Sequence, residues 1–135
     1  MPTSTAVAKT SELAAHARAG LRAFFRIAEL WNLSIAEQMT LLGLTSRSTF
    51  FKWKKSPASA SPARDTLERI SYLLGIYKDL QILIPDAGAA DAWIRRPNSA
   101  PIFGGRSALA RMLSGNVSDL YIVRRYLDAQ RGGWA

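Results

Sequence analysis

The stretch GLTSRSTFFKWKK, residues 43–55, interleaves aromatic side chains with four cationic ones. The cations and hydroxyl groups that could reach a phosphate or a base edge belong to Arg47, Ser48, Thr49, Lys52, Lys54 and Lys55. Such groups donate hydrogen bonds to phosphate oxygens and to the edges of bases in the major groove, so the pattern predicts contact with DNA. The alternative is an amphipathic helix with a solvated basic face, whose terminal lysines only complement the helix dipole.

Two short helices and a tight turn are needed to present these side chains to a groove. Ser34, with Glu37 three residues later, has the spacing of a capping box at the start of a first helix. Gly43 is the residue type that ends a helix in a left-handed turn, and Thr45 or Ser46 can cap the helix that follows. The pattern predicts a helix-turn-helix unit, whose second helix lies in the major groove.

The apolar residues of this unit have a structural interpretation. Phe50 and Trp53 are three residues apart, so both can face the core and are not expected to stack on bases. Leu44 can fill the space between the two helices, and Phe51 lies to the side.

The overall charge agrees with an anionic partner. The chain has 135 residues, a formal net charge of +8 and 48% hydrophobic residues, which is enough for a packed core. Residues 1–56 hold eight Lys/Arg against three Asp/Glu, and residues 86–135 hold seven against four. Residues 57–85 are neutral, with three of each. The basic excess therefore lies in the two ends, and nucleic acid is the usual partner of such a balance.

Several kinds of chemistry lack the residues they need. There is no cysteine and one histidine, His16, which excludes disulfides, thiolate metal sites and a multi-histidine metal site. No Ser/His/Asp set or phosphate-binding loop is present, so we expect neither an enzyme nor a cofactor. The N-terminal region lacks the apolar core of a signal peptide or a membrane span, which predicts a cytoplasmic protein with no membrane partner.

Helical periodicity extends over most of the chain. We expect a loose tail over residues 1–10, then apolar residues at helical spacing up to Trp31, with a possible break at Gly20. Residues 56–63 have the composition of a linker. Pro62 fits the first position of the next helix with Ser61 as its cap.

The apolar stripe of this next helix runs through Leu67, Ile70, Leu74, Tyr77 and Leu80. Gly75 is a possible point of interruption in this helix.

The last third of the chain predicts short helices and loops. A short helix stops before Pro97, a loop follows, and Ser107 caps a helix over residues 108–113. Asn116 or Ser118 opens the final helix, after which Gly132 and Gly133 are expected to break regular structure.

The stretch from Asp91 to about Arg131 resembles the C-terminal domain of the Xre/MbcA/ParS family of antitoxins. The residues that match the family pattern are Trp93, Ile94, Pro97, Asn98, Phe103, Gly104, Gly105, Arg106, Leu109, Leu113, Gly115, Val123 and Leu127. Ala108 departs from it, since the family often has proline there. The helix-turn-helix half fits the same family more loosely.

This resemblance implies an antitoxin of a type II toxin-antitoxin module. Its partner would be a RES-domain toxin that degrades or uses NAD, and its N-terminal half would bind the promoter of its own operon. The family's C-terminal region approaches the NAD pocket of the toxin. On that basis the expected toxin-binding residues are Arg124, Arg125, Tyr126, Arg131 and Trp134.

The expected fold is all-α, with an N-terminal helix-turn-helix domain joined by a long helix to a small helical C-terminal domain. The expected divisions are residues 1–20 (tail and partial helix), 21–84 (DNA binding and dimerisation) and 85–135 (toxin binding). A homodimer is expected through the apolar face of residues 62–84, because DNA half-sites invite two-fold symmetry.

The alternative function is that of a free-standing helix-turn-helix transcriptional regulator with a ligand-sensing C-terminal domain. Such a regulator would need a closed apolar cavity for a ligand within residues 86–135.

Overall fold

The fold is entirely helical over the residues that the structure, a computed structural model, describes: the backbone of residues 4–132 and the side chains of residues 12–132. Its elements are α1 (Ser4–Leu30), α2 (Ile35–Leu42), α3 (Arg47–Lys55), η1 (Pro57–Ser59), α4 (Arg64–Leu83), α5 (Ala87–Ala92), η2 (Trp93–Arg95), α6 (Ala108–Met112) and α7 (Val117–Gly132). Pro97 and Ser107 form an isolated β-bridge, and the described residues contain no strand. The all-α expectation is confirmed.

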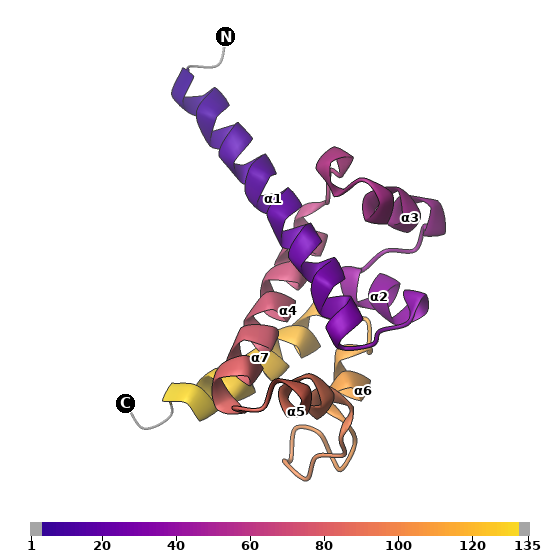
Figure 1. The fold of residues 1–135 in the computed structure, drawn as a ribbon, viewed down its shortest axis with the longest axis vertical. Helices are drawn as coiled ribbons and strands as arrows, with labels where there is room; N and C mark the ends of the chain where they lie inside the picture. Colours follow the sequence, from indigo (N-terminus) through magenta and orange to yellow (C-terminus); the bar gives the residue numbers. More distant parts are fainter. Residues whose placement is uncertain (1–3, 133–135) are drawn as a thin grey trace.

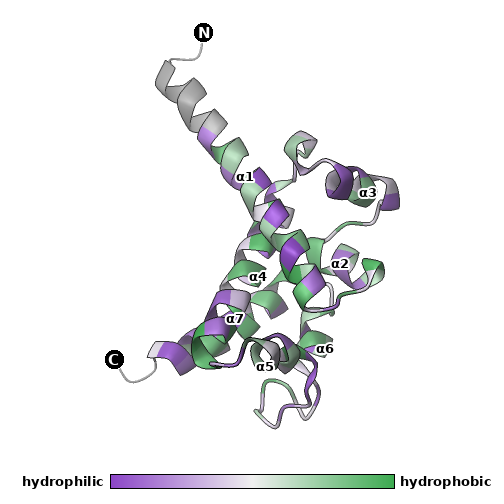
Figure 2. Ribbon diagram, in the orientation of Figure 1, coloured by the Kyte–Doolittle hydropathy of each residue, from purple (hydrophilic) through white to green (hydrophobic). Residues whose placement is uncertain are grey.

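Helix α4 is the centre of the molecule. It packs against α1 on one side and, most extensively, along α7 on the other (Figure 1). Leu73, Ile76 and Leu80 of α4 are fully buried, and the core continues through Phe24 of α1 and Leu120 of α7. Figure 2 shows hydrophobic and hydrophilic residues alternating along these helices, and the buried residues at the contacts are mostly hydrophobic. Helix α4 therefore belongs to the core of both halves.

Helix α1 is longer than expected. It begins at Ser4 and continues without a break past Gly20, so the expected loose tail is wrong over residues 4–10 and the interruption at Gly20 is wrong. Residues 1–3 of the expected tail lie outside the described residues. A β-carbon at Gly20 would lie 3.3 Å from Cγ2 of Ile70, so glycine permits close packing of α1 on α4. That packing offsets the cost of a glycine inside a helix, about 1 kcal/mol. The N-terminal part of α1 projects away from the rest of the fold (Figure 1).

Helix α4 begins two residues later than expected. Its N-cap is Ala63, which makes no side-chain cap, so the assignment of Ser61 as cap and Pro62 as first residue is wrong. A tertiary contact holds this end instead: the buried hydroxyl of Thr66 donates a 2.9 Å hydrogen bond to the carbonyl oxygen of Leu42. The helix then runs unbroken through Gly75.

The C-terminal elements largely follow the expectation. Ser107 caps α6 by accepting a hydrogen bond from the amide of Ala110, as predicted. Helix α7 starts directly after Asn116 and still includes Gly132, so the break expected at Gly132 is wrong. Arg131 explains the continued last turn, because its Nη1 donates a 2.8 Å hydrogen bond to Oδ1 of Asp79 in α4. Within the described helices, none is long and apolar enough to cross a membrane.

Candidate nucleic-acid interface and C-terminal surface

Helices α2 and α3 form the predicted helix-turn-helix unit. Ser34 and Glu37 make the full capping box, with a 3.1 Å bond from the Glu37 amide to Ser34 Oγ and a 2.8 Å bond from the Ser34 amide to Glu37 Oε1. Gly43 has a φ of 71°, the left-handed conformation that ends α2. Ser46, and not Thr45, caps α3.

The side chains of α3 divide into an inner and an outer face. Phe50 is fully buried and Trp53 is 7% exposed, so both anchor α3 in the core as predicted. Of the six expected DNA-binding residues, the exposed ones are Arg47, Ser48, Lys52, Lys54 and Lys55, whereas Thr49 is half-buried. At 3.6 residues per turn, Ser48 and Lys55 lie opposite the anchored face, and Lys54 lies at its edge.

One residue on the outer face is apolar. Phe51 is 42% exposed and lies between Arg47 and Lys55 on the helix surface. The guanidinium carbon of Arg47 lies 5.5 Å from the centre of the Phe51 ring, within the range of a cation–π contact. Residue spacing alone places Phe51 only to the side of the helix. The i, i+4 spacing of an arginine and an aromatic residue is the signal that could have singled it out.

The turn between α2 and α3 is braced from α4. Arg69 donates from Nε to Oδ2 of Asp65 at 2.8 Å and from Nη2 to the carbonyl oxygen of Gly115 at 2.9 Å. A β-carbon at Gly43 would lie 2.7 Å from that Nε. One arginine thus contacts the helix-turn-helix turn and the loop before α7 at once.

A second arginine joins the two halves at the other end of the unit. Arg95 of η2 donates to the carbonyl oxygens of Trp31 and Asn32, the latter at 2.8 Å, where α1 ends. It also reaches Oε1 of Glu37 at 3.3 Å. Partial burial alone would raise the pKa of Glu37, but the Ser34 amide and the Arg95 guanidinium outweigh it and lower that pKa. The Ser34 amide therefore does most to favour the ionised Glu37 carboxylate of the capping box, and Arg95 adds to this from the C-terminal half.

The expected toxin-binding residues do not share one surface. Arg124 lies across α4, donating to the carbonyl oxygen of Ser71 at 3.3 Å, and Arg131 pairs with Asp79, as described above. Tyr126 is half-buried, with its ring 5.3 Å from that of Phe103. Arg125 is exposed. Trp134 lies outside the described residues.

The loop between η2 and α6 is held by a charged pair that sequence reasoning missed. Arg111 donates from Nη1 to the carbonyl oxygen of Ile102 and from Nε to Oδ1 of Asp119 at 2.9 Å. Ser114 Oγ donates to Oδ2 of the same carboxylate at 2.6 Å. The Ser114 hydroxyl lowers the pKa of Asp119; burial opposes it, and Arg111 adds to the lowering. These side chains, with Arg106, line a hollow of about 510 Å³.

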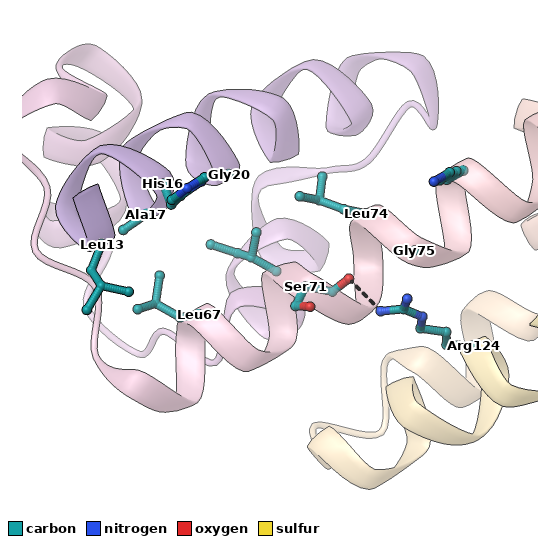
Figure 3. Close-up of a pocket in the computed structure, with 11 residues that line it drawn as sticks. Leu13, His16, Ala17, Gly20, Leu67, Ser71, Leu74, Gly75 and Arg124 are labelled. Carbon is teal, nitrogen blue, oxygen red and sulfur yellow. Dashed lines mark hydrogen bonds between the residues drawn. The ribbon is translucent and has the colours of Figure 1, made fainter. Parts of the chain in front are cut away.

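An apolar groove lies between α1 and α4 (Figure 3). It has a volume of about 560 Å³, and its largest apolar side chains are the exposed Leu13, the partly buried Leu67 and Leu74, and the buried Ile70. Arg124 closes the end nearest α7, and His16 lies on the α1 side. His16 is exposed, and the described residues contain no group of three His, Cys, Asp or Glu that could hold a metal ion.

Comparison with known families accounts for both halves. A family model for the antitoxin Xre-like helix-turn-helix domain matches residues 12–75. A second model, for the antitoxin Xre/MbcA/ParS C-terminal toxin-binding domain, matches residues 79–133. The two matches meet inside α4, the helix that both halves share. The chain is thus an antitoxin in architecture, with a helix-turn-helix DNA-binding domain followed by a helical toxin-binding domain.

A close relative has nearly the same extent. The uncharacterized protein y4oB of Sinorhizobium fredii (strain NBRC 101917 / NGR234) is 56% identical to this chain over 115 residues. The match covers 85% of this chain and 86% of the relative. The chain belongs to the Xre/MbcA/ParS antitoxin family.

Proposed function

We propose that this antitoxin represses its own operon by binding promoter DNA through the outer face of α3, and that its C-terminal half binds and blocks a RES-domain toxin that degrades NAD. An antitoxin bound to its promoter works where the chromosome lies, in the cytoplasm. The observation that carries the DNA-binding part is the exposed row of cations and hydroxyl groups on α3, opposite the buried Phe50 and Trp53.

The support for a toxin partner lies in residues 79–133, which match the toxin-binding domain. Within this part, Arg125 and Arg131 are the exposed arginines among the expected contact residues on α7. Arg131 already pairs with Asp79, and Arg124 donates to the carbonyl oxygen of Ser71. We therefore assign contact with the toxin to Arg125 and the exposed end of α7, together with Trp134 beyond it. Arg124, Tyr126 and Arg131 then hold α7 in position.

A truncation separates these roles. Removing residues 133–135 deletes Trp134 and leaves the ion pair between Arg131 and Asp79 in place. If Trp134 anchors the toxin, this truncation weakens toxin binding without lowering the stability of the antitoxin alone. Removing all residues after Leu127 would not separate toxin binding from stability, because it also removes Arg131, the ion-pair partner of the buried Asp79.

We also propose that the antitoxin is a homodimer and that the groove between α1 and α4 lies in its interface. Leu13 is 64% exposed beside Leu67 and Leu74, on a part of α1 that projects from the fold. A single projecting helix is marginally stable in water unless it packs against another surface. The projecting helix of a second copy, related by a two-fold axis, would fill this groove and be packed itself.

A free-standing ligand-sensing regulator is less well supported. The hollow in the C-terminal half is lined by Arg106, Arg111 and Asp119, so it is not the closed apolar cavity that ligand sensing requires. The apolar groove lies instead between α1 and α4, outside residues 86–135 except for Arg124.

The experiment that tests DNA binding removes two cations from α3. Arg47→Ala with Lys52→Ala should weaken binding to the promoter fragment and lower the salt dependence of binding by about one unit of slope for each lost phosphate contact. The matched control, Arg106→Ala with Arg125→Ala, removes the same charge from exposed residues of the C-terminal half. If both double variants bind equally, general charge attraction explains the binding and α3 is not the recognition helix.

A further inference from the structure

We infer that Phe51 is a specificity-determining residue that contacts the methyl group of a thymine in the major groove, beside the base pair that Arg47 contacts. This inference rests on the proposed binding of promoter DNA by α3. It adds to that proposal an apolar base contact, which phosphate binding does not require.

The first support is the position of Phe51 on the helix. Phe50 and Trp53 direct one side of α3 into the core, which places Phe51 on the opposite side among Arg47, Ser48, Lys52 and Lys55. Phe51 is 42% exposed, although its ring packs in an edge-to-face arrangement with that of Phe50, at 5.4 Å between ring centres. An exposed phenyl ring in the middle of a basic surface has no charge to offer a phosphate.

The second support is the chemistry of the surface that a basic helix would meet. Most groups that the base edges present in the major groove are hydrogen-bond donors or acceptors, and the C5 methyl group of thymine is the largest apolar group among them. A phenyl ring that enters the groove therefore has its best apolar partner there. Phenylalanine is among the side chains suited to that contact.

The third support is the contact between Phe51 and Arg47. The guanidinium carbon lies 5.5 Å from the ring centre, so the ring restricts the positions that the arginine can occupy. Arg47 is in the first turn of α3, where recognition helices contact base edges, and arginine most often reads guanine. Residues one helical turn apart are separated by about 5.4 Å along the axis, which spans one to two steps of base pairs. The thymine is therefore adjacent or next-adjacent to the base pair that Arg47 reads.

The test removes one methyl group from the DNA without altering base pairing. A short duplex selected by the wild-type protein from a randomised library is prepared with each thymine in turn replaced by deoxyuridine. We expect one position per half-site at which the replacement weakens binding by the wild-type protein about three- to fivefold, the effect of one buried methyl group. Phe51→Ala should bind the thymine duplex more weakly by a similar factor and should not distinguish the two bases at that position.

Two further variants make the result specific. Phe51→Leu keeps an apolar side chain and should retain part of the discrimination. Tyr121→Ala removes a similarly exposed aromatic ring that also has an arginine over it, Arg125 at 5.9 Å, but on α7. This control should leave both affinities unchanged.

The outcomes separate this inference from the proposed function. If the wild-type protein binds its selected duplex with high specificity but no thymine replacement affects it, the methyl contact is wrong and DNA binding by α3 stands. If Phe51→Ala shows the same discrimination as the wild-type protein, another residue contacts the methyl group. If no duplex is selected above non-specific binding, the inference fails together with the proposed promoter binding.

Discussion

Arg69 occupies the space that a side chain at Gly43 would need. A β-carbon at Gly43 would lie 2.7 Å from Nε of Arg69 and 2.9 Å from Oδ2 of Asp65, its ion-pair partner. The same guanidinium donates to the carbonyl oxygen of Gly115 in the other half of the chain. The turn that orients α3 therefore depends on a residue of the central helix, and through it on the loop before α7.

Gly43→Ala should destabilise the protein strongly. The alanine must adopt a φ of 71° and must also displace Arg69 from two hydrogen bonds. We expect a loss of about 3 kcal/mol in the free energy of unfolding, measured by chemical denaturation. The matched control is Gly104→Ala, at a φ of 57° with no neighbouring atom within 4 Å, which should cost only the strain, about 1 kcal/mol. Equal losses for the two variants would show that Arg69 does not brace the turn.

Asp119→Asn should lower the free energy of unfolding at neutral pH but not in acid. The pKa of Asp119 is lower in the folded state than its ordinary value, chiefly because the Ser114 hydroxyl donates to the carboxylate. A lowered pKa contributes stability above the unfolded value of about 3.9, and this contribution is lost as the pH falls through the folded value.

The difference in unfolding free energy between the wild type and Asp119→Asn should therefore be about 1 kcal/mol at neutral pH and should shrink below pH ~4. Urea denaturation across this pH range measures it. Glu29→Gln, at an exposed position of α1, is the control. A difference that stays constant into acid would contradict ionic anchoring of the loop by Asp119.

Asp128→Asn should stabilise the protein. The nearby carboxyl of Asp79, together with partial burial, raises the pKa of Asp128. Oδ2 of Asp79 is buried and has no hydrogen-bond partner. An asparagine amide at position 128 could donate to it, and the Arg124–Asp128 pair that is lost is long, at 3.6 Å, and more than a third exposed on both sides.

We expect Asp128→Asn to raise the melting temperature at neutral pH by about 3 °C, corresponding to about 1 kcal/mol. Because the folded pKa is raised, the wild type should gain stability as the pH falls through that value, and the variant should lack this gain. Asp128→Ala, which cannot donate, should show no increase. A melting temperature for Asp128→Asn below that of Asp128→Ala would overturn the account of the Asp79 carboxylate.

Leu74→Glu should disrupt the proposed dimer. It introduces a carboxylate into the apolar groove between α1 and α4, which costs several kcal/mol if a second copy covers the site. Sedimentation velocity at micromolar concentration should show a dimeric wild type and a monomeric variant. Ile82→Glu changes an exposed position of the same helix outside the groove and should remain a dimer. A monomeric wild type would remove the proposed dimer altogether.

The sequence predicted the helix-turn-helix unit in detail because its signals are local. The capping box at Ser34, the left-handed Gly43 and the inward Phe50 and Trp53 all follow from the spacing of neighbouring residues. The cap of α6 at Ser107 was predictable for the same reason.

The errors arose where distant contacts decide the local structure. Gly20 and Gly75 look like helix breakers, but each lies where another element approaches closely: Ile70 at Gly20 and the Arg124 side chain at Gly75. Likewise, Gly132 remains helical in a turn that Arg131 ties to α4.

Contacts between residues far apart in the sequence could not be predicted either. Arg69 reaches Gly115 and Arg95 reaches the end of α1, and no periodicity marks either partner. For the same reason the expected toxin-binding residues of α7 could be located on one helix but not sorted into those that face inward and those that face outward.

The proposal that the C-terminal half neutralises an NAD-degrading toxin is tested by measuring the NAD content of cells. A candidate RES-domain toxin, taken from the reading frame next to the gene for this chain, is expressed alone, with the full antitoxin, and with the antitoxin carrying Arg125→Glu and lacking residues 133–135. We expect NAD to fall with the toxin alone, to be restored by the full antitoxin, and to stay low with the altered antitoxin, which should still fold and bind DNA. NAD that stays depleted in the presence of the full antitoxin, or that the toxin never depletes, would contradict it.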